Sequence, residues 1–313
     1  MKLRALPLLA AVAISAFALT SCTSASSELD PTANGGDKGS QTPDTSGDAT
    51  FQLDEAARAL LPQEVRDRGY LTAVYSPTFA PFEYYDTDNS TIIGFDVDFM
   101  RAVGQVLGLD IKTEAAAFEA MLPGIQSGKY EISNSGIAIT EERKKSADFV
   151  AFASSGSGIA VAKGNPKNIS NTFDALCGLK IAAGKGTNQG LKILPGLSDQ
   201  CTAAGKAAIE IQLFPSQNDG YLALQSNRVD GYMTDSFMVT HEAELAGGDW
   251  ELAPGNDFEP VLTGIVTPKD SPLTPAIRAA VIKVIENHDA YVKLNEKWSI
   301  PLSTLITPDQ VDG

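Results

Sequence analysis

Residues 140–143, Thr-Glu-Glu-Arg, combine a helix-start signal with a cation whose chemistry suits an anionic group. Thr140 is expected to cap a helix, and the two acidic residues after it suit the positive end of that helix. Arg143 would lie in the same first turn, where a cation is unfavourable unless an anion joins it. A guanidinium can bind a carboxylate through two parallel hydrogen bonds, which lysine cannot do. Arg143 is therefore a candidate carboxylate ligand; the alternative is a solvated surface run with the two lysines that follow.

Asp235 is the second charged candidate, because it comes directly after a strand-like run at residues 229–233. A charged group is costly to desolvate unless an opposite charge pairs with it, so a buried ammonium group needs an acid of this kind. The alternative is an ordinary helix cap, since a helical pattern begins at Ser236.

An internal similarity relates these two regions of the chain. Residues 126–131 (QSGKYE) resemble residues 225–230 (QSNRVD), and each follows a helical run and leads into a short strand. A polar loop follows each strand, Ser135-Gly136 in one case and Thr234-Asp235 in the other. Ligands of open α/β sheets bind at loops beyond the carboxyl ends of strands. The similarity predicts two lobes facing each other across a cleft, unless the six-residue match is due to chance.

The elements that would position these residues alternate between strands and helices, which predicts an α/β architecture. A helical face ending at Gly108 and a C-terminal helical face with Ile277, Val281, Val284 and Tyr291 are expected. Strands are expected at residues 70–75, 111–116, 130–134, 179–183, 209–214 and 229–233.

The N-terminus indicates export. Lys2 and Arg4 precede an apolar run that ends before Cys22, so residues 1–21 are typical of a secretory signal. The residues up to Cys22 resemble the lipobox of bacterial lipoproteins, in which the cysteine is acylated. Residues 22–50 are rich in Ser, Thr, Gly, Asp and Pro, which predicts a lipidated, flexible linker.

Composition excludes several classes of function. The net charge of -15 becomes -15 - 2 = -17 without residues 1–21, and an acidic body argues against nucleic acid as a partner. The two histidines, His241 and His288, neighbour no motif for nucleophilic or metal chemistry. Cys177 and Cys201 remain after Cys22 and are expected to form a disulfide in an oxidising compartment, with two buried thiols as the alternative.

Three groups of segments resemble the bacterial extracellular solute-binding proteins of family 3, which serve polar amino-acid uptake. They are residues 76–83 with 94–98, residues 128–143, and residues 186–189 with 230–235. The resemblance covers nearly all of residues 66–300. It implies the type II periplasmic-binding-protein fold, with two α/β lobes joined by two hinge strands. Lobe 1 would be residues 51–153 plus 264–313, lobe 2 residues 158–258, and the hinges residues 153–157 and 259–263.

The same resemblance implies a site in which Arg143 holds the carboxylate of an amino acid and Asp235 holds its ammonium group. Ser76 falls where relatives for cationic amino acids place an acid, which argues against such ligands and for a neutral polar or acidic one. The resemblance implies nine ligand-binding residues: Phe79, Phe118, Ser135, Gly136, Ala138, Arg143, Asn188, Gln189 and Asp235.

The function expected from these points is a substrate-binding lipoprotein of an ABC importer, not an enzyme, with no metal or organic cofactor. Its partners would be a small amino acid, the ABC permease with its ATPase, and the outer face of the cytoplasmic membrane through the lipid anchor. A monomer is expected, with no nucleic acid bound. The alternatives are a ligand-sensing receptor subunit or a dehydratase-like enzyme on the same fold.

Overall fold

The structure is a computed structural model, and it describes residues 49–245 and 247–312. The predicted signal 1–21, Cys22 and nearly all of the linker 22–50 lie outside the described residues. Within the described part of the chain, no helix combines the length and the apolar character needed to cross a bilayer.

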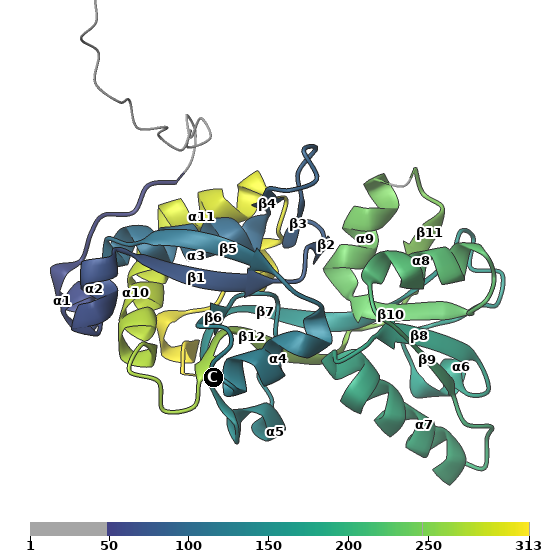
Figure 1. Cartoon of the computed structure of the whole chain (residues 1–313). Helices are drawn as coiled ribbons and strands as arrows, with labels where there is room; N and C mark the ends of the chain where they lie inside the picture. The colour runs from purple at the N-terminus through teal and green to yellow at the C-terminus, as the bar shows by residue number, and fades with distance from the viewer. Residues whose placement is uncertain (1–48, 246, 313) are drawn as a thin grey trace, which may run out of the picture. The chain divides into compact units, whose positions relative to one another are not determined.

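Two long strands, β7 (Ala147–Ala162) and β12 (Phe258–Pro268), run antiparallel through the middle of a nine-stranded sheet. The sheet has the order β5-β1-β6-β12-β7-β10-β8-β9, with β11 also paired to β7. We call β5, β1 and β6 the first half and β10, β8 and β9 the second half; Figure 1 shows them at opposite ends of β7. The other strands are β1 (Tyr70–Tyr75), β5 (Asp110–Ala115), β6 (Ile132–Ser133), β8 (Lys180–Gly184), β9 (Glu210–Phe214), β10 (Gly231–Asp235) and β11 (Trp250–Leu252), and a small separate sheet contains β2 (Thr78–Phe79), β3 (Glu83–Tyr85) and β4 (Ile92–Ile93).

Helices cover both halves, and the C-terminal ones return to the first half, beside α3 (Figure 1). There the rings of Phe99 and Phe152 lie 4.9 Å apart, and the hydroxyl of Tyr291 donates to the carbonyl of Phe152 at 2.7 Å. The helices are α1 (Glu55–Ala59), α2 (Gln63–Arg68), α3 (Phe95–Leu107), α4 (Phe118–Gln126), α5 (Glu141–Lys144), α6 (Phe173–Leu176), the π-helical η1 (Gln189–Ile193), α7 (Leu194–Ala203), α8 (Gln217–Gln225), α9 (Ser236–Leu245), α10 (Thr274–Glu286), α11 (His288–Lys297), and the 3-10 turns η2 (Leu302–Thr304) and η3 (Pro308–Gln310).

The expected elements are found, with three differences. The first is that β10 covers Gly231–Asp235 instead of residues 229–233, so Thr234 and Asp235 end the strand rather than forming the loop after it. β1 spans the expected strand, and α3 ends where Gly108 adopts a left-handed φ of 63°. The strand expected at residues 130–134 is reduced to Ile132–Ser133. The prediction of a single C-terminal helical face is wrong. Asn287, with a ψ of 66°, ends α10, and α11 runs in a new direction. Tyr291 therefore lies on a different helix from Ile277.

The two remaining cysteines come together in the second half. Cys177 follows α6 and Cys201 lies in α7, and their sulfur atoms are 2.09 Å apart with the Cα atoms separated by 5.5 Å. A Cα separation of this size is usual for a bridged pair.

Candidate ligand-binding site

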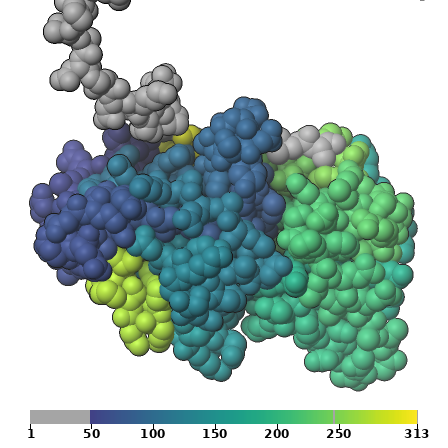
Figure 2. Space-filling view, in the orientation of Figure 1, coloured from purple at the N-terminus to yellow at the C-terminus, as the bar shows by residue number. Residues whose placement is uncertain are grey.

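The two halves meet along a seam, where blue-to-teal atoms of the first half touch green atoms of the second half (Figure 2). The contacts that cross it among the described residues include three between side chains or to a side chain. The rings of Phe82 and Phe237 are 6.2 Å apart, and Lys185 Nζ lies 3.4 Å from Glu119 Oε1. The third contact is made by Arg143, and it lies beside a cavity.

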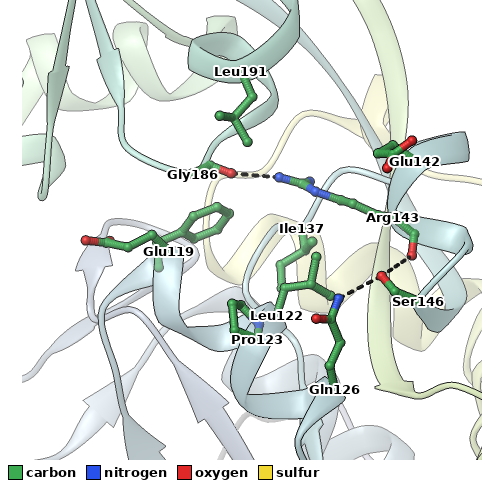
Figure 3. A pocket seen from close by; sticks show the side chains of 11 residues that line it. Glu119, Leu122, Pro123, Gln126, Ile137, Glu142, Arg143, Ser146, Gly186 and Leu191 are labelled. Carbon is green, nitrogen blue, oxygen red and sulfur yellow. Dashed lines mark hydrogen bonds between the residues drawn. The ribbon is translucent and has the colours of Figure 1, made fainter.

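Arg143 extends from α5 of the first half toward the second half (Figure 3). Thr140 caps α5 as expected, because its hydroxyl accepts from the amide of Arg143 at 3.2 Å. The guanidinium donates to the carbonyl of Ala138 through Nη1 and to the carbonyl of Gly186 through Nη2, both at 2.8 Å. Burial lowers the pKa of Arg143 to about 10, so the group remains positive at neutral pH.

The guanidinium of Arg143 keeps unused binding capacity. It has five N–H donors, and two of them bind the carbonyls of Ala138 and Gly186. No carboxylate of the described residues forms an ion pair with it. A buried cation in this state can accept an external anion, as the first motif of the sequence predicts.

A cavity of about 350 Å³ adjoins Arg143 and takes its walls from both halves of the sheet (Figure 3). Cavities of this size hold small organic ligands. The wall from α4 is largely apolar, and Gly186 and Leu191 close it from the second half. The lining residues are Phe118, Glu119, Leu122, Pro123, Gln126, Ile137, Glu142, Arg143, Ser146, Gly186 and Leu191.

The two predicted aromatic residues have different surroundings. Phe118 is the first residue of α4 and lines the cavity, although it also packs against a core cluster that contains Met121. Phe79 ends β2 and is half-buried, and a Cβ atom placed on Gly136 would lie 3.8 Å from its ring. Phe118 is therefore in the cavity, whereas Phe79 covers the turn at Gly136.

Asp235 is the last residue of β10 and belongs to a polar group in the second half and on β7. Its Oδ1 accepts from the hydroxyl of Ser155 at 2.8 Å and from Gln189 Nε2 at 3.4 Å. Gln189 Nε2 also donates to the hydroxyl of Ser157 at 3.1 Å. Burial above all, and then the charge of Asp257, raises the pKa of Asp235 to about 6, although the bond from Ser155 opposes this shift.

One short turn contacts both charged residues. Gly186 accepts from Arg143, and Gln189, three residues further along, donates to Asp235. Three residues span about 10 Å at most, so the two contacts lie close together. Asp235 is not part of the lining of the cavity in Figure 3, so the cavity directly includes only the cationic partner of the predicted pair.

Asn188, Ala138 and Ser135 complete the predicted set. Asn188 is 5% exposed, and its Nδ2 has no hydrogen-bond acceptor within the described part of the chain. Ala138 is buried, and its carbonyl accepts from Arg143. The hydroxyl of Ser135 donates to Glu83 and accepts from the amide of Ser76 at 3.1 Å.

The amide of Gly136 already has a partner within the protein. Its φ of 54° lies in the left-handed region, and its amide donates to Asp96 Oδ2 at 2.8 Å. Asp96 and Glu83 are both fully buried. The Ser135–Gly136 turn is thus held by two acidic side chains that sequence reasoning did not select.

A comparison with protein families matches residues 71–300 to the family described as "Bacterial extracellular solute-binding proteins, family 3". The match covers most of the chain. The chain belongs to this family.

The relatives of this family 3 protein include amino-acid-binding proteins. The arginine-binding protein ArgT of Corynebacterium glutamicum is 30% identical over 243 residues, which are 78% of this chain and 78% of that protein. An arginine-bound mutant of ArgBP from T. maritima is 27% identical with a TM-score of 0.61, covering 70% of this chain and 97% of that one. The ancestral amino acid-binding protein AncCDT-1, a precursor of cyclohexadienyl dehydratase, is 28% identical with a TM-score of 0.63, covering 77% and 99%.

These findings confirm the predicted family, the type II fold and the main functional prediction, a substrate-binding protein for amino acids in ABC transport. The names of the relatives describe binding proteins, and one is a precursor of an enzyme. Among the described residues, no group of three or more His, Cys, Asp or Glu side chains is arranged to hold a metal ion.

The residues that sequence reasoning missed lie inside motifs it had noted. Glu83 is flanked by Phe82 and Tyr84, and Asp96 by Phe95 and Val97. An acid within an apolar run is a signal of a buried, partnered carboxyl group, because an unpaired one is costly to bury. That signal was available in both cases.

Proposed function

We propose that this family 3 protein binds the carboxylate of an α-amino acid with Arg143, beside the cavity between the two halves of its sheet. The observation that carries the proposal is the unpaired, largely buried guanidinium with three free N–H groups. A carboxylate would accept two of these in parallel without displacing the carbonyls of Ala138 and Gly186.

The opposite end of the ligand would bind Asp235. Its carboxylate has donors in Ser155 and Gln189, and no cationic side chain of the described residues forms an ion pair with it. An ammonium group would supply the missing positive charge. Asn188, with an unpartnered buried amide, and Gln189 would add polar contacts from the same turn, and Phe118 would pack against the aliphatic part.

L-Arginine is the first ligand candidate. ArgT and the T. maritima protein are named for or bound to arginine. We therefore replace the sequence-based preference for a neutral or acidic ligand, which rested on Ser76.

The arrangement of the strands supports a transport role. The two halves would act as lobes, residues 51–153 with 264–313 and residues 158–258, that close about hinges at residues 153–157 and 259–263. The closed, monomeric form would be presented to an ABC permease and its ATPase. After removal of residues 1–21, acylated Cys22 and the linker 22–50 would tether the protein outside the cytoplasmic membrane. Export would keep Cys177 and Cys201 oxidised.

A thermal-shift screen of the protein against the twenty amino acids tests the proposal. A ligand at 100 times its Kd stabilises the folded state by about 2.7 kcal/mol, so L-arginine should raise the melting temperature clearly. The same amino acid should be recovered unchanged after incubation, as expected of a binding protein rather than an enzyme. A screen in which no amino acid changes the melting temperature would contradict the proposal.

A further inference from the structure

Two fully buried acidic side chains hold the turn that follows β6. Glu83 Oε1 accepts from the hydroxyl of Ser135, and Asp96 Oδ2 accepts from the amide of Gly136 at 2.8 Å. The backbone of Asp96 takes part as well, since its carbonyl accepts from Asn134 Nδ2 at 2.9 Å. Three successive residues, 134–136, are thus fixed by contacts to β3 and α3.

The other oxygen of each carboxyl group, Glu83 Oε2 and Asp96 Oδ1, is buried and has no donor among the described residues. The two residues lie side by side, because their side chains bind adjacent residues of one turn and the amide of Asp96 donates to the carbonyl of Phe82, next to Glu83, at 2.9 Å. A carboxylate cannot donate, so a hydrogen bond between two carboxyl groups requires a proton on one of them. One proton between Glu83 Oε2 and Asp96 Oδ1 would satisfy both atoms.

The charged surroundings of the pair favour this proton. Tyr75 faces the pair from β1, and its buried hydroxyl has no hydrogen-bond partner in the described chain. The charge of Asp235, on β10, acts on both Glu83 and Asp96. The nearest cation that acts on Tyr75, Arg101, pairs with Asp98 at 2.9 Å. Burial, and for Glu83 also the charge of Asp96, raises the pKa of both carboxyl groups above their usual range.

We propose that Glu83 and Asp96 share one proton and act together as positioning residues for the Ser135–Gly136 turn, so that ligand affinity depends on that proton. The inference rests on the proposed function, because the turn is expected beside the carboxylate of the amino acid. It adds an acid pair to the site and a direction for its pH dependence.

Loss of the shared proton weakens the site in two ways. Two buried carboxylates repel each other, which separates the supports of Ser135 and Gly136. The second negative charge also lies next to the expected position of the ligand carboxylate. Affinity therefore falls as pH rises through the ionisation of the pair, at most about tenfold per pH unit for one linked proton.

Glu83→Gln separates this account from a merely structural role. The amide oxygen of glutamine can accept from Ser135 and its NH₂ group can donate to Asp96, so the hydrogen bonds persist without a titrating proton. Isothermal calorimetry with L-arginine in steps from pH 6 to 9 should show an affinity of the wild type that falls with pH, by at most about tenfold per pH unit. Glu83→Gln should change by less than about threefold, and Glu64→Gln, which alters an exposed acid of α2, should follow the wild type.

One measurement without ligand keeps the test independent of the ligand assignment, and a second measurement with ligand adds to it. The infrared difference spectrum of wild type minus Glu83→Gln at pH 7.5 should contain the carbonyl band of a protonated carboxylic acid. Calorimetry of the wild type in two buffers at pH 8.5 gives the proton uptake on L-arginine binding. This measurement still tests the proposal if Glu83→Gln does not fold.

The possible results are distinct. Absence of L-arginine binding at every pH, with the infrared band present, removes the ligand assignment and keeps the shared proton. An absent infrared band, a wild-type affinity that does not fall with pH, or an equal slope in Glu83→Gln overturns the proposal. Absence of proton uptake by a wild-type protein that binds L-arginine overturns it as well.

Discussion

Replacing Arg143 with alanine should remove most of the affinity for L-arginine. The guanidinium is largely buried and contributes its three free N–H groups to a space that otherwise offers the ligand carboxylate mostly apolar contacts. Removing one partner of a buried ion pair costs about 3–5 kcal/mol, since the other charge is left uncompensated. At 1.4 kcal/mol per factor of ten, Kd should increase roughly a hundred- to several-thousand-fold.

Arg143→Lys is the matched variant, because it keeps the charge and loses the planar donor fork. Lysine cannot bind both the carbonyl of Gly186 and a carboxylate bidentately, so its Kd should lie about ten- to a hundredfold above that of the wild type. Lys145→Ala, at an exposed neighbouring cation paired with Glu142, should leave Kd unchanged.

Isothermal calorimetry at pH 7 gives Kd for these variants. The melting temperature without ligand checks that each of them folds. The reasoning fails if Arg143→Ala binds L-arginine within threefold of the wild type, because the carboxylate would then have another main partner.

The remaining predictions concern Asp235, Phe118 and the cysteine pair. Burial raises the pKa of Asp235 to about 6, so the stability linked to this group is present below about pH 4 and is lost as pH rises through 6. Asp235→Asn should therefore be more stable than wild type at pH 8, by up to about 3 kcal/mol in urea unfolding, while binding amino acids far more weakly. Phe118→Ala should increase Kd about tenfold or more in calorimetry, because the cavity loses its aromatic wall. Cys177→Ser with Cys201→Ser should lower the free energy of unfolding by about 3 kcal/mol, as expected for a bridge over 24 residues, and reductant should reproduce this in the wild type.

Local patterns were sufficient for elements whose limits are set by nearby residues. β1 matches its predicted limits, and Gly108 ends α3 because the left-handed conformation there suits a glycine. The cap at Thr140 was also predictable, since its contact to Arg143 spans only three residues. These features therefore depend on very short stretches of sequence.

Features that depend on distant residues could not be predicted in the same way. The apolar spacing of the C-terminal segment continues from Val284 to Tyr291, but the backbone turns at Asn287 and both residues are still buried. The spacing of apolar residues indicates which of them are buried. It does not change at a bend between two helices when the apolar faces of both pack against one core. The roles of Glu83 and Asp96 were hidden for a similar reason: their partners are about 40 to 52 residues away.

Arg143 and Asp235 carry opposite charges, and neither forms an ion pair among the described residues. This connects the stability of the protein with its function. Arg143 is supported by two carbonyls, and the pKa of Asp235 is raised by burial, so each group is less stable than it would be with a ligand bound. A zwitterion would supply both missing charges at once, which favours its capture over a ligand that carries only one.

The contacts across the seam can be compared with the free energy of ligand binding. The pair of Lys185 and Glu119 is partly exposed and contributes about 0–1 kcal/mol, and the contact of Phe82 with Phe237 adds about 0.5–1.5 kcal/mol. The hydrogen bond from Arg143 to Gly186 involves a charged group and contributes about 1.5–3 kcal/mol. A ligand that binds with a Kd of 1 μM contributes about 8 kcal/mol, more than these three contacts together. We therefore expect binding of the ligand, rather than these contacts alone, to hold the halves closed.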